Sequence, residues 1–258
     1  MTAPEILSLL CAATAAGAIN AVAGGGTILT FPTLLAIGTL PVVANATSTV
    51  ALVFGTGGSV YGFRRHIVSI REWLWRFVPV SLLGGLIGSW LLTITGNEIF
   101  SRLVPFLILF ATLLFLAQGL VANLIRRPAV ESARAPLIWP AVVFQFLVAI
   151  YGGFFGAGIG ILMLATLGFV GLSDIHQMNA LKNILGSLIN VVAAIMFVCR
   201  GLVDWPKVGV MTVGAVAGYY LGSHYSQKIP QVWVRRIVLG IGFGISAMTF
   251  YRQFSLNF

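Results

Sequence analysis

Long apolar runs separated by short polar connections make up most of the chain. A helix that spans a membrane needs about 20 mostly apolar residues. Runs close to that length predict eight membrane-spanning helices, at residues 5–22, 42–62, 73–94, 99–120, 137–155, 175–198, 206–225 and 232–251. Two apolar pieces, 26–38 and 158–171, are too short to cross, at about 13 residues each. We expect them to be glycine-rich broken or re-entrant segments.

The second half of the chain repeats the order of small, polar and apolar residues found in the first half, at an offset of 134 residues. The aligned pairs are Gly24 with Gly158, Gly26 with Gly160, Asn45 with Asn179, Ser48 with Lys182, Thr49 with Asn183 and Thr56 with Asn190. This offset predicts two homologous membrane repeats, 1–125 and 137–258, joined by a cytoplasmic linker at 126–136. The repeats are parallel if each half crosses four times and inverted if a short segment also crosses, and the sequence leaves both open.

The composition supports an all-α integral membrane protein. The chain is 59% hydrophobic and 8% charged, with a mean hydropathy of +1.00, whereas a soluble domain is about 25% charged. The net charge of +9 is scattered between apolar runs, which excludes a nucleic-acid surface and indicates loops beside membrane lipid. The two cysteines and three histidines show no metal-ligand spacing, so we expect no metal and no cofactor.

The distribution of lysine and arginine orients the predicted helices. Most of these residues fall in the connections that lie inside if the N-terminus is inside, which predicts a multi-pass inner-membrane protein with both termini in the cytoplasm. The last hairpin opposes this bias, because Lys228, Arg235 and Arg236 fall outside. The N-terminal segment has no basic stretch and carries Glu5, so we interpret it as the first membrane helix and not as a signal peptide.

Two glycine-rich stretches precede the short apolar pieces: NAVAGGGTILTFP at residues 20–32 and YGGFFGAGIGILM at residues 151–163. Glycine lets the backbone unwind and expose N–H groups, which form an anion site at the start of a half-helix. Close helix packing through small residues would explain one such stretch, but two at matched positions favour the anion site. Neither stretch matches the nucleotide phosphate loop. The candidate residues are Gly24, Gly25, Gly26, Thr27, Gly156, Gly158 and Gly160.

A polar stripe runs along the helix predicted after the second short piece. His176, Asn179, Asn183, Ser187 and Asn190 fall within about 80° of one another on a helix, with Lys182 beside them. An intramembrane stripe of this kind is expected to face protein or water. We therefore predict that Lys182 supplies positive potential to an anion. The alternative is that its long side chain reaches the membrane surface.

The matching helix of the first half carries milder polar groups at Asn45, Ser48 and Thr49. Ser48 stands at the position that corresponds to the lysine. We expect Asn45, Asn179 and Asn183 to donate hydrogen bonds to the anion.

At the two glycine stretches and the paired NATST and NALKN helices, the chain resembles the sulfite exporter TauE/SafE family of membrane permeases. The resemblance covers nearly the whole chain. It implies two homologous halves and a secondary transporter without ATP-binding domains, linked to sulfite, sulfonates and related sulfur anions. One departure is that Pro32 corresponds to Thr166, so the second short segment is expected to differ in shape.

These patterns predict a secondary transporter, a permease or exporter, for a small anion such as sulfite, a sulfonate or a related sulfur oxyanion. An anion channel is the alternative. A membrane-embedded enzyme ranks third, because the sequence shows no nucleophile–base pair and no paired intramembrane carboxylates. The direction of transport, the coupling ion and the formation of a homo-oligomer stay open.

Overall fold

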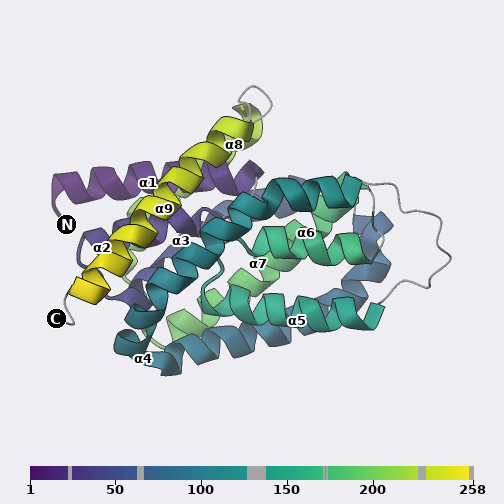
Figure 1. Ribbon diagram of the computed structural model, residues 1–258, viewed down its shortest axis with the longest axis horizontal. Coiled ribbons are helices and arrows are strands. Elements are labelled where there is room, and N and C mark those ends of the chain that lie inside the picture. Colours follow the sequence, from purple (N-terminus) through teal and green to yellow (C-terminus); the bar gives the residue numbers. More distant parts are fainter. Residues whose placement is uncertain are drawn as a thin grey trace.

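The chain folds into a bundle of helices in the computed structural model (Figure 1). The structure describes residues 1–22, 25–62, 67–126, 138–170, 172, 174–225 and 231–255, and no strand occurs among them. The helices are α1 (Ala3–Val22), α2 (Thr27–Ala36), α3 (Pro41–Gly62), α4 (Ile67–Arg126), α5 (Ile138–Phe154), α6 (Ile159–Phe169), α7 (Ile175–Cys199), α8 (Trp205–Tyr225) and α9 (Gln231–Ser255).

Three described segments are long and apolar enough to cross a membrane: Ala3–Ala21, Arg71–Ala117 and Gln177–Cys199. Shorter apolar helices accompany them. The described residues are thus all-helical as predicted, with helices suited to a membrane, while the count of eight crossings stays a prediction. The helices predicted at 73–94 and 99–120 are two legs of α4, which folds back on itself at Gly96 (φ 72°, ψ 164°). A residue with a side chain rarely adopts this backbone conformation, so the glycine marks the turn.

The two short apolar pieces form the shortest described helices, α2 with 10 residues and α6 with 11. Each begins directly after a glycine segment, with Gly26 before α2 and Gly158 before α6. Positive φ angles at Gly25 (104°), Gly156 (79°) and Gly158 (80°) explain why both connections need glycine.

Close backbone contacts join helices from opposite halves of the chain. Helix α1 packs along α8, and α5 packs along the first leg of α4. A Cβ added at Gly88 would overlap the carbonyl oxygen of Ile150, and one added at Gly218 would overlap that of Thr14. Small residues let two helix backbones approach closely where lipid offers no hydrophobic driving force. The proposed boundaries of the repeats stay a prediction, and linker residues 127–136 lie outside the described residues.

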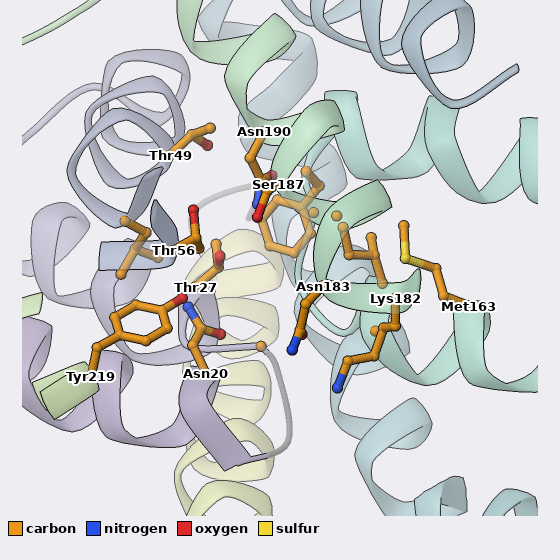
Figure 2. Close-up of a pocket in the computed structure, with 17 residues that line it drawn as sticks. Asn20, Thr27, Thr49, Thr56, Met163, Lys182, Asn183, Ser187, Asn190 and Tyr219 are labelled. Atoms are coloured by element: carbon orange, nitrogen blue, oxygen red, sulfur yellow. The ribbon is translucent and has the colours of Figure 1, made fainter. Parts of the chain in front are cut away.

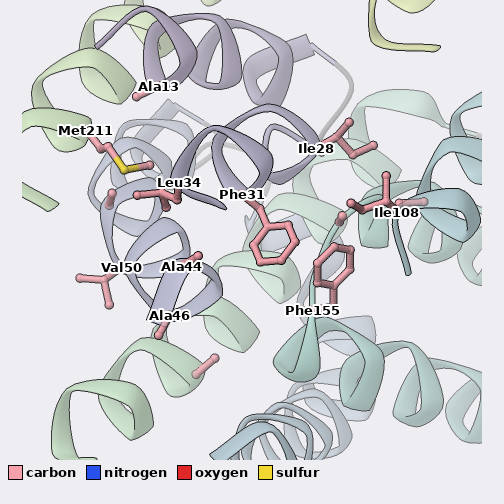
Figure 3. Close-up of a cluster of buried hydrophobic side chains, with 14 of the residues drawn as sticks. Ala13, Ile28, Phe31, Leu34, Ala44, Ala46, Val50, Ile108, Phe155 and Met211 are labelled. Atoms are coloured by element: carbon pink, nitrogen blue, oxygen red, sulfur yellow. The ribbon is translucent and has the colours of Figure 1, made fainter. Parts of the chain in front are cut away.

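An aromatic cluster fixes the position of α2 near the second glycine segment. Phe31 of α2 contacts Phe155 edge to face, with ring centroids 5.3 Å apart, and contacts Phe100 at 6.1 Å. Both Phe31 and Phe155 are buried, and Figure 3 shows them facing each other beside Ile108 of α4. Because edge-to-face pairs add stability beyond their buried area, this cluster fixes α2 against α4 and against the segment that leads into α6.

Candidate functional site

A cavity of about 80 Å³ lies where α1, α2, α3, α6, α7 and α8 approach one another (Figure 2). Its lining residues are Asn20, Gly25, Thr27, Thr49, Leu52, Thr56, Phe155, Gly156, Ile159, Gly160, Met163, Lys182, Asn183, Gly186, Ser187, Asn190 and Tyr219. Among the described residues that line the cavity, Lys182 alone has a charged side chain, and none has a carboxylate. The cavity therefore carries a positive potential if the ammonium is protonated.

The two glycine segments meet beside this cavity. A Cβ placed on Gly25 would lie 3.5 Å from the backbone nitrogen of Gly158 and would overlap the ring of Phe115. Helices α2 and α6 thus begin next to each other, with Thr27 and Gly160 in the cavity wall. The first N–H groups of a helix lack intrahelical acceptors and carry a partial positive charge. Two helix starts at one cavity are suited to an anion.

A side chain from the preceding helix braces each glycine segment. The Oδ1 atom of Asn20 in α1 accepts a hydrogen bond from the backbone nitrogen of Gly26, at 2.6 Å. The hydroxyl of Tyr151 in α5 donates to the carbonyl oxygen of Ala157, at 2.7 Å. Both contacts cap backbone groups that the unwound segment would otherwise leave unpaired, so they hold the helix starts in position.

Lys182 of α7 is buried, with 7% of the residue exposed. Its ammonium donates to the Oδ1 atom of Asn179, at 3.2 Å. Within the described part of the chain, the salt bridges pair other residues, and none includes Lys182. A buried ammonium that lacks a counter-ion is costly in a membrane, so a bound anion would stabilise it. Its burial also argues against a side chain that reaches the membrane surface.

The remaining polar wall comes from three helices. Asn183, Ser187 and Asn190 of α7 line one side, and Figure 2 shows them along a single face of that helix. Thr49 and Thr56 of α3 line another side. The third contribution comes from Tyr219 of α8, whose hydroxyl lies beside the amide nitrogen of Asn20 in Figure 2.

The structure brings seven of the thirteen candidate residues into the cavity wall and places five others behind it or beside it. The seven are Gly25, Thr27, Thr49, Gly156, Gly160, Lys182 and Asn183, and the five are Gly26, Asn45, Ser48, Gly158 and Asn179. Gly24 and the side chain of His176 lie outside the described residues.

Two of the residues behind the wall have polar partners within the protein. Asn45, expected to donate to an anion, is 1% exposed, and its amide nitrogen donates to the carbonyl oxygen of Phe154 at 3.1 Å. The Ser48 hydroxyl pairs with that of Thr30 at 2.6 Å. These contacts connect α3 to the end of α5 and to α2, and neither Asn45 nor Ser48 lines the cavity.

Asn20 and Tyr219 are cavity residues that the sequence patterns did not single out. Asn20 is the first residue of the first glycine stretch, so its position in the sequence could have identified it as a site residue. No sequence pattern pointed to Tyr219, because it reaches the site through the packing of α8 on α1 and α3.

The model of the family described as "Sulfite exporter TauE/SafE" matches residues 9–249. A probable membrane transporter protein of Haemophilus influenzae is 30% identical over 253 residues, covering 96% of both chains. The probable membrane transporter protein YfcA of Escherichia coli K12 is 27% identical over 255 residues, covering 97% of this chain and 92% of the relative. No solved structure matches the chain. The chain therefore belongs to the sulfite exporter TauE/SafE family and is a membrane transporter.

Proposed function

We propose that the chain is a secondary transporter, a permease or exporter, that moves a small anion across the inner membrane. Sulfite, sulfonates and related sulfur oxyanions are the first candidates. The observation that carries the proposal is the buried ammonium of Lys182 at a cavity where the starts of α2 and α6 meet.

The electrostatics of the cavity favour an anion over a cation. No carboxylate lines the described wall. The ammonium of Lys182 and the positive ends of two helix dipoles lie at the same cavity. Charge-assisted hydrogen bonds to an oxyanion are about twice as strong as neutral ones. An anion therefore offsets the cost of burying Lys182 and gains hydrogen bonds in the same step.

We further propose that the two halves are inverted repeats. The pairing of α1 with α8 corresponds to the pairing of α5 with the first leg of α4. Gly84 and Gly88 on α4 lie 134 residues before Gly218 and Gly222 on α8, the same offset that relates the glycine segments. In Figure 1, α2 and α6 extend from the middle of the bundle toward opposite ends. Inverted repeats with broken helices at a central site are typical of secondary transporters.

Flux measurements on the purified full-length protein in proteoliposomes test the proposal. We expect sulfite uptake that saturates with concentration and responds to an imposed ion gradient. Lys182→Gln should lower this uptake at an equal amount of folded protein. Unsaturated, high-conductance flux would support a channel instead. The absence of uptake for sulfite, sulfate and small sulfonates would refute transport of a sulfur oxyanion.

A further inference from the structure

The contacts of Asn20 determine which hydrogen-bonding group Tyr219 presents to the cavity. The Oδ1 atom of Asn20 accepts from the backbone N–H of Gly26, and Figure 2 shows its amide nitrogen beside the hydroxyl of Tyr219. That nitrogen can only donate, so the oxygen of Tyr219 can meet it only as an acceptor. The phenolic proton then stays available, and Tyr219 presents a donor to a ligand.

The threonines of α3 present the opposite polarity. The hydroxyl of Thr49 donates to the carbonyl oxygen of Asn45 at 2.9 Å, and that of Thr56 donates to the carbonyl oxygen of Val53 at 2.8 Å. A carbonyl oxygen has no proton to give, so each hydroxyl proton is committed to the helix backbone. Both oxygens therefore offer only lone pairs to the cavity, and this wall accepts a hydrogen bond from a ligand.

Charge and size limit the ligand further. Lys182 supplies one positive charge, and the described lining has no other charged side chain. A singly charged anion matches it, whereas a dianion would leave one buried negative charge uncompensated. The cavity of about 80 Å³ has room for only a few water-sized groups and is much smaller than pockets for drug-sized ligands.

From these three properties we propose that the cavity binds a small, singly charged oxyanion that keeps one acidic proton. The charged oxygens accept hydrogen bonds from Tyr219 and Lys182, and the retained proton is donated to the threonine oxygens of α3. This inference rests on the proposed anion transport and narrows its substrate class. Among sulfur oxyanions, hydrogen sulfite fits this description, while sulfate has one charge too many and sulfonates lack the proton.

Two pairs of anions separate proton recognition from charge recognition. Hydrogencarbonate and nitrate are both planar and singly charged, but only hydrogencarbonate carries a proton. Methanesulfonate and sulfate are both tetrahedral, but they differ by one charge. Calorimetry on the purified full-length protein at pH about 8 should show hydrogencarbonate binding about tenfold more tightly than nitrate. This is the factor expected for one additional hydrogen bond, from the proton of hydrogencarbonate to a threonine oxygen. Methanesulfonate should likewise bind about tenfold more tightly than sulfate.

Three variants assign these preferences to residues. The double variant Thr49→Val/Thr56→Val should remove the advantage of hydrogencarbonate and leave nitrate binding unchanged, because the single retained proton needs only one of the two oxygens. Thr33→Val is the matched control, because Thr33 forms the same intrahelical bond, to Leu29 at 2.8 Å, without lining the cavity. Tyr219→Phe should weaken all four anions by a similar factor.

The outcomes separate this inference from the proposed function. If all four anions bind without regard to proton or charge, or if the double threonine variant folds and keeps the preference for hydrogencarbonate, the inference is wrong and anion transport stands. If the wild-type protein binds none of the four anions and does not transport sulfite, both proposals fail.

Discussion

Replacing Lys182 with glutamine separates the contribution of its charge to anion binding from its contribution to stability. Glutamine keeps a polar side chain of similar length and can still donate to Asn179, the residue that the ammonium contacts at 3.2 Å. The ammonium is buried and, within the described residues, forms no salt bridge. The substitution therefore removes a charge that the empty protein does not compensate.

The expected effects on binding and stability have opposite signs. A hydrogen bond to a charged group contributes about 1.5–3 kcal/mol and a neutral one about 0.5–1.5 kcal/mol, so anion affinity should fall roughly tenfold. A charged lysine in a membrane costs roughly 2.5–3.5 kcal/mol on insertion scales. Because glutamine avoids part of that cost, the ligand-free variant should melt at the same temperature as the wild type or a few degrees higher.

Lys207 provides the control. Its ammonium lies 2.6 Å from Asp204 and 3.1 Å from the hydroxyl of Thr39, and it does not line the cavity. Lys207→Gln should therefore lower the melting temperature and leave anion binding unchanged, the reverse of the pattern at Lys182. Sulfite titration by calorimetry and a thermal melt of each purified variant measure both quantities. Wild-type affinity in folded Lys182→Gln, with a lower melting temperature, would show that the lysine is structural.

Three further predictions follow from the backbone geometry and the charge pattern. Gly38→Ala should cost about 1–2 kcal/mol of stability because its φ angle is 81°. Gly156→Ala should cost more, because its φ angle is 79° and its Cβ would also lie 2.9 Å from the carbonyl oxygen of Gly152. Only Gly156→Ala should also weaken anion binding in calorimetry, since Gly156 lines the cavity; equal binding losses would contradict this. In thermal melts, Gly88→Ala should destabilise strongly because its Cβ meets the backbone of α5, whereas Gly244→Ala, with nothing within 4 Å, should be neutral or stabilising by up to about 1 kcal/mol. Ser132→Cys, in a variant without the native cysteines, should react with an impermeant thiol reagent in intact cells if the N-terminus is cytoplasmic, because inverted repeats place the linker on the opposite side of the membrane from the N-terminus. Labelling only after the cells are opened would contradict either the inverted repeats or the cytoplasmic N-terminus.

Hydropathy predicted the helices well because apolar length and glycine position are local properties of the chain. The 13-residue pieces became α2 and α6, and the polar gap between the two central apolar runs contains Gly96, where α4 folds back. The stripe on α7 also placed Asn183 and Lys182 on the cavity side, since helical periodicity fixes which residues share a face.

Helical periodicity does not identify the residues that each helix face contacts, so the partners of α3 and α8 could not be predicted from it. Asn45 and Thr49 lie one turn apart on α3. The amide nitrogen of Asn45 donates to the carbonyl oxygen of Phe154, whereas Thr49 lines the cavity. Tyr219 enters the site because glycines on α8 let it approach α1 closely. Both outcomes depend on contacts between residues far apart in the sequence, which a single sequence without aligned relatives does not reveal.

The glycine contacts between α1 and α8 have a consequence for how the protein is made. Thr14 of α1 is synthesised long before Gly218 of α8, the residue against which it packs. The face of α1 that contacts α8 therefore stays uncovered in the bilayer until nearly the whole chain has left the ribosome. Contacts between such distant residues slow folding and prolong exposure of unpaired surfaces. Neither half can complete its own packing during synthesis, so a chain cut at the central linker should be stable only when both pieces are produced in the same cell.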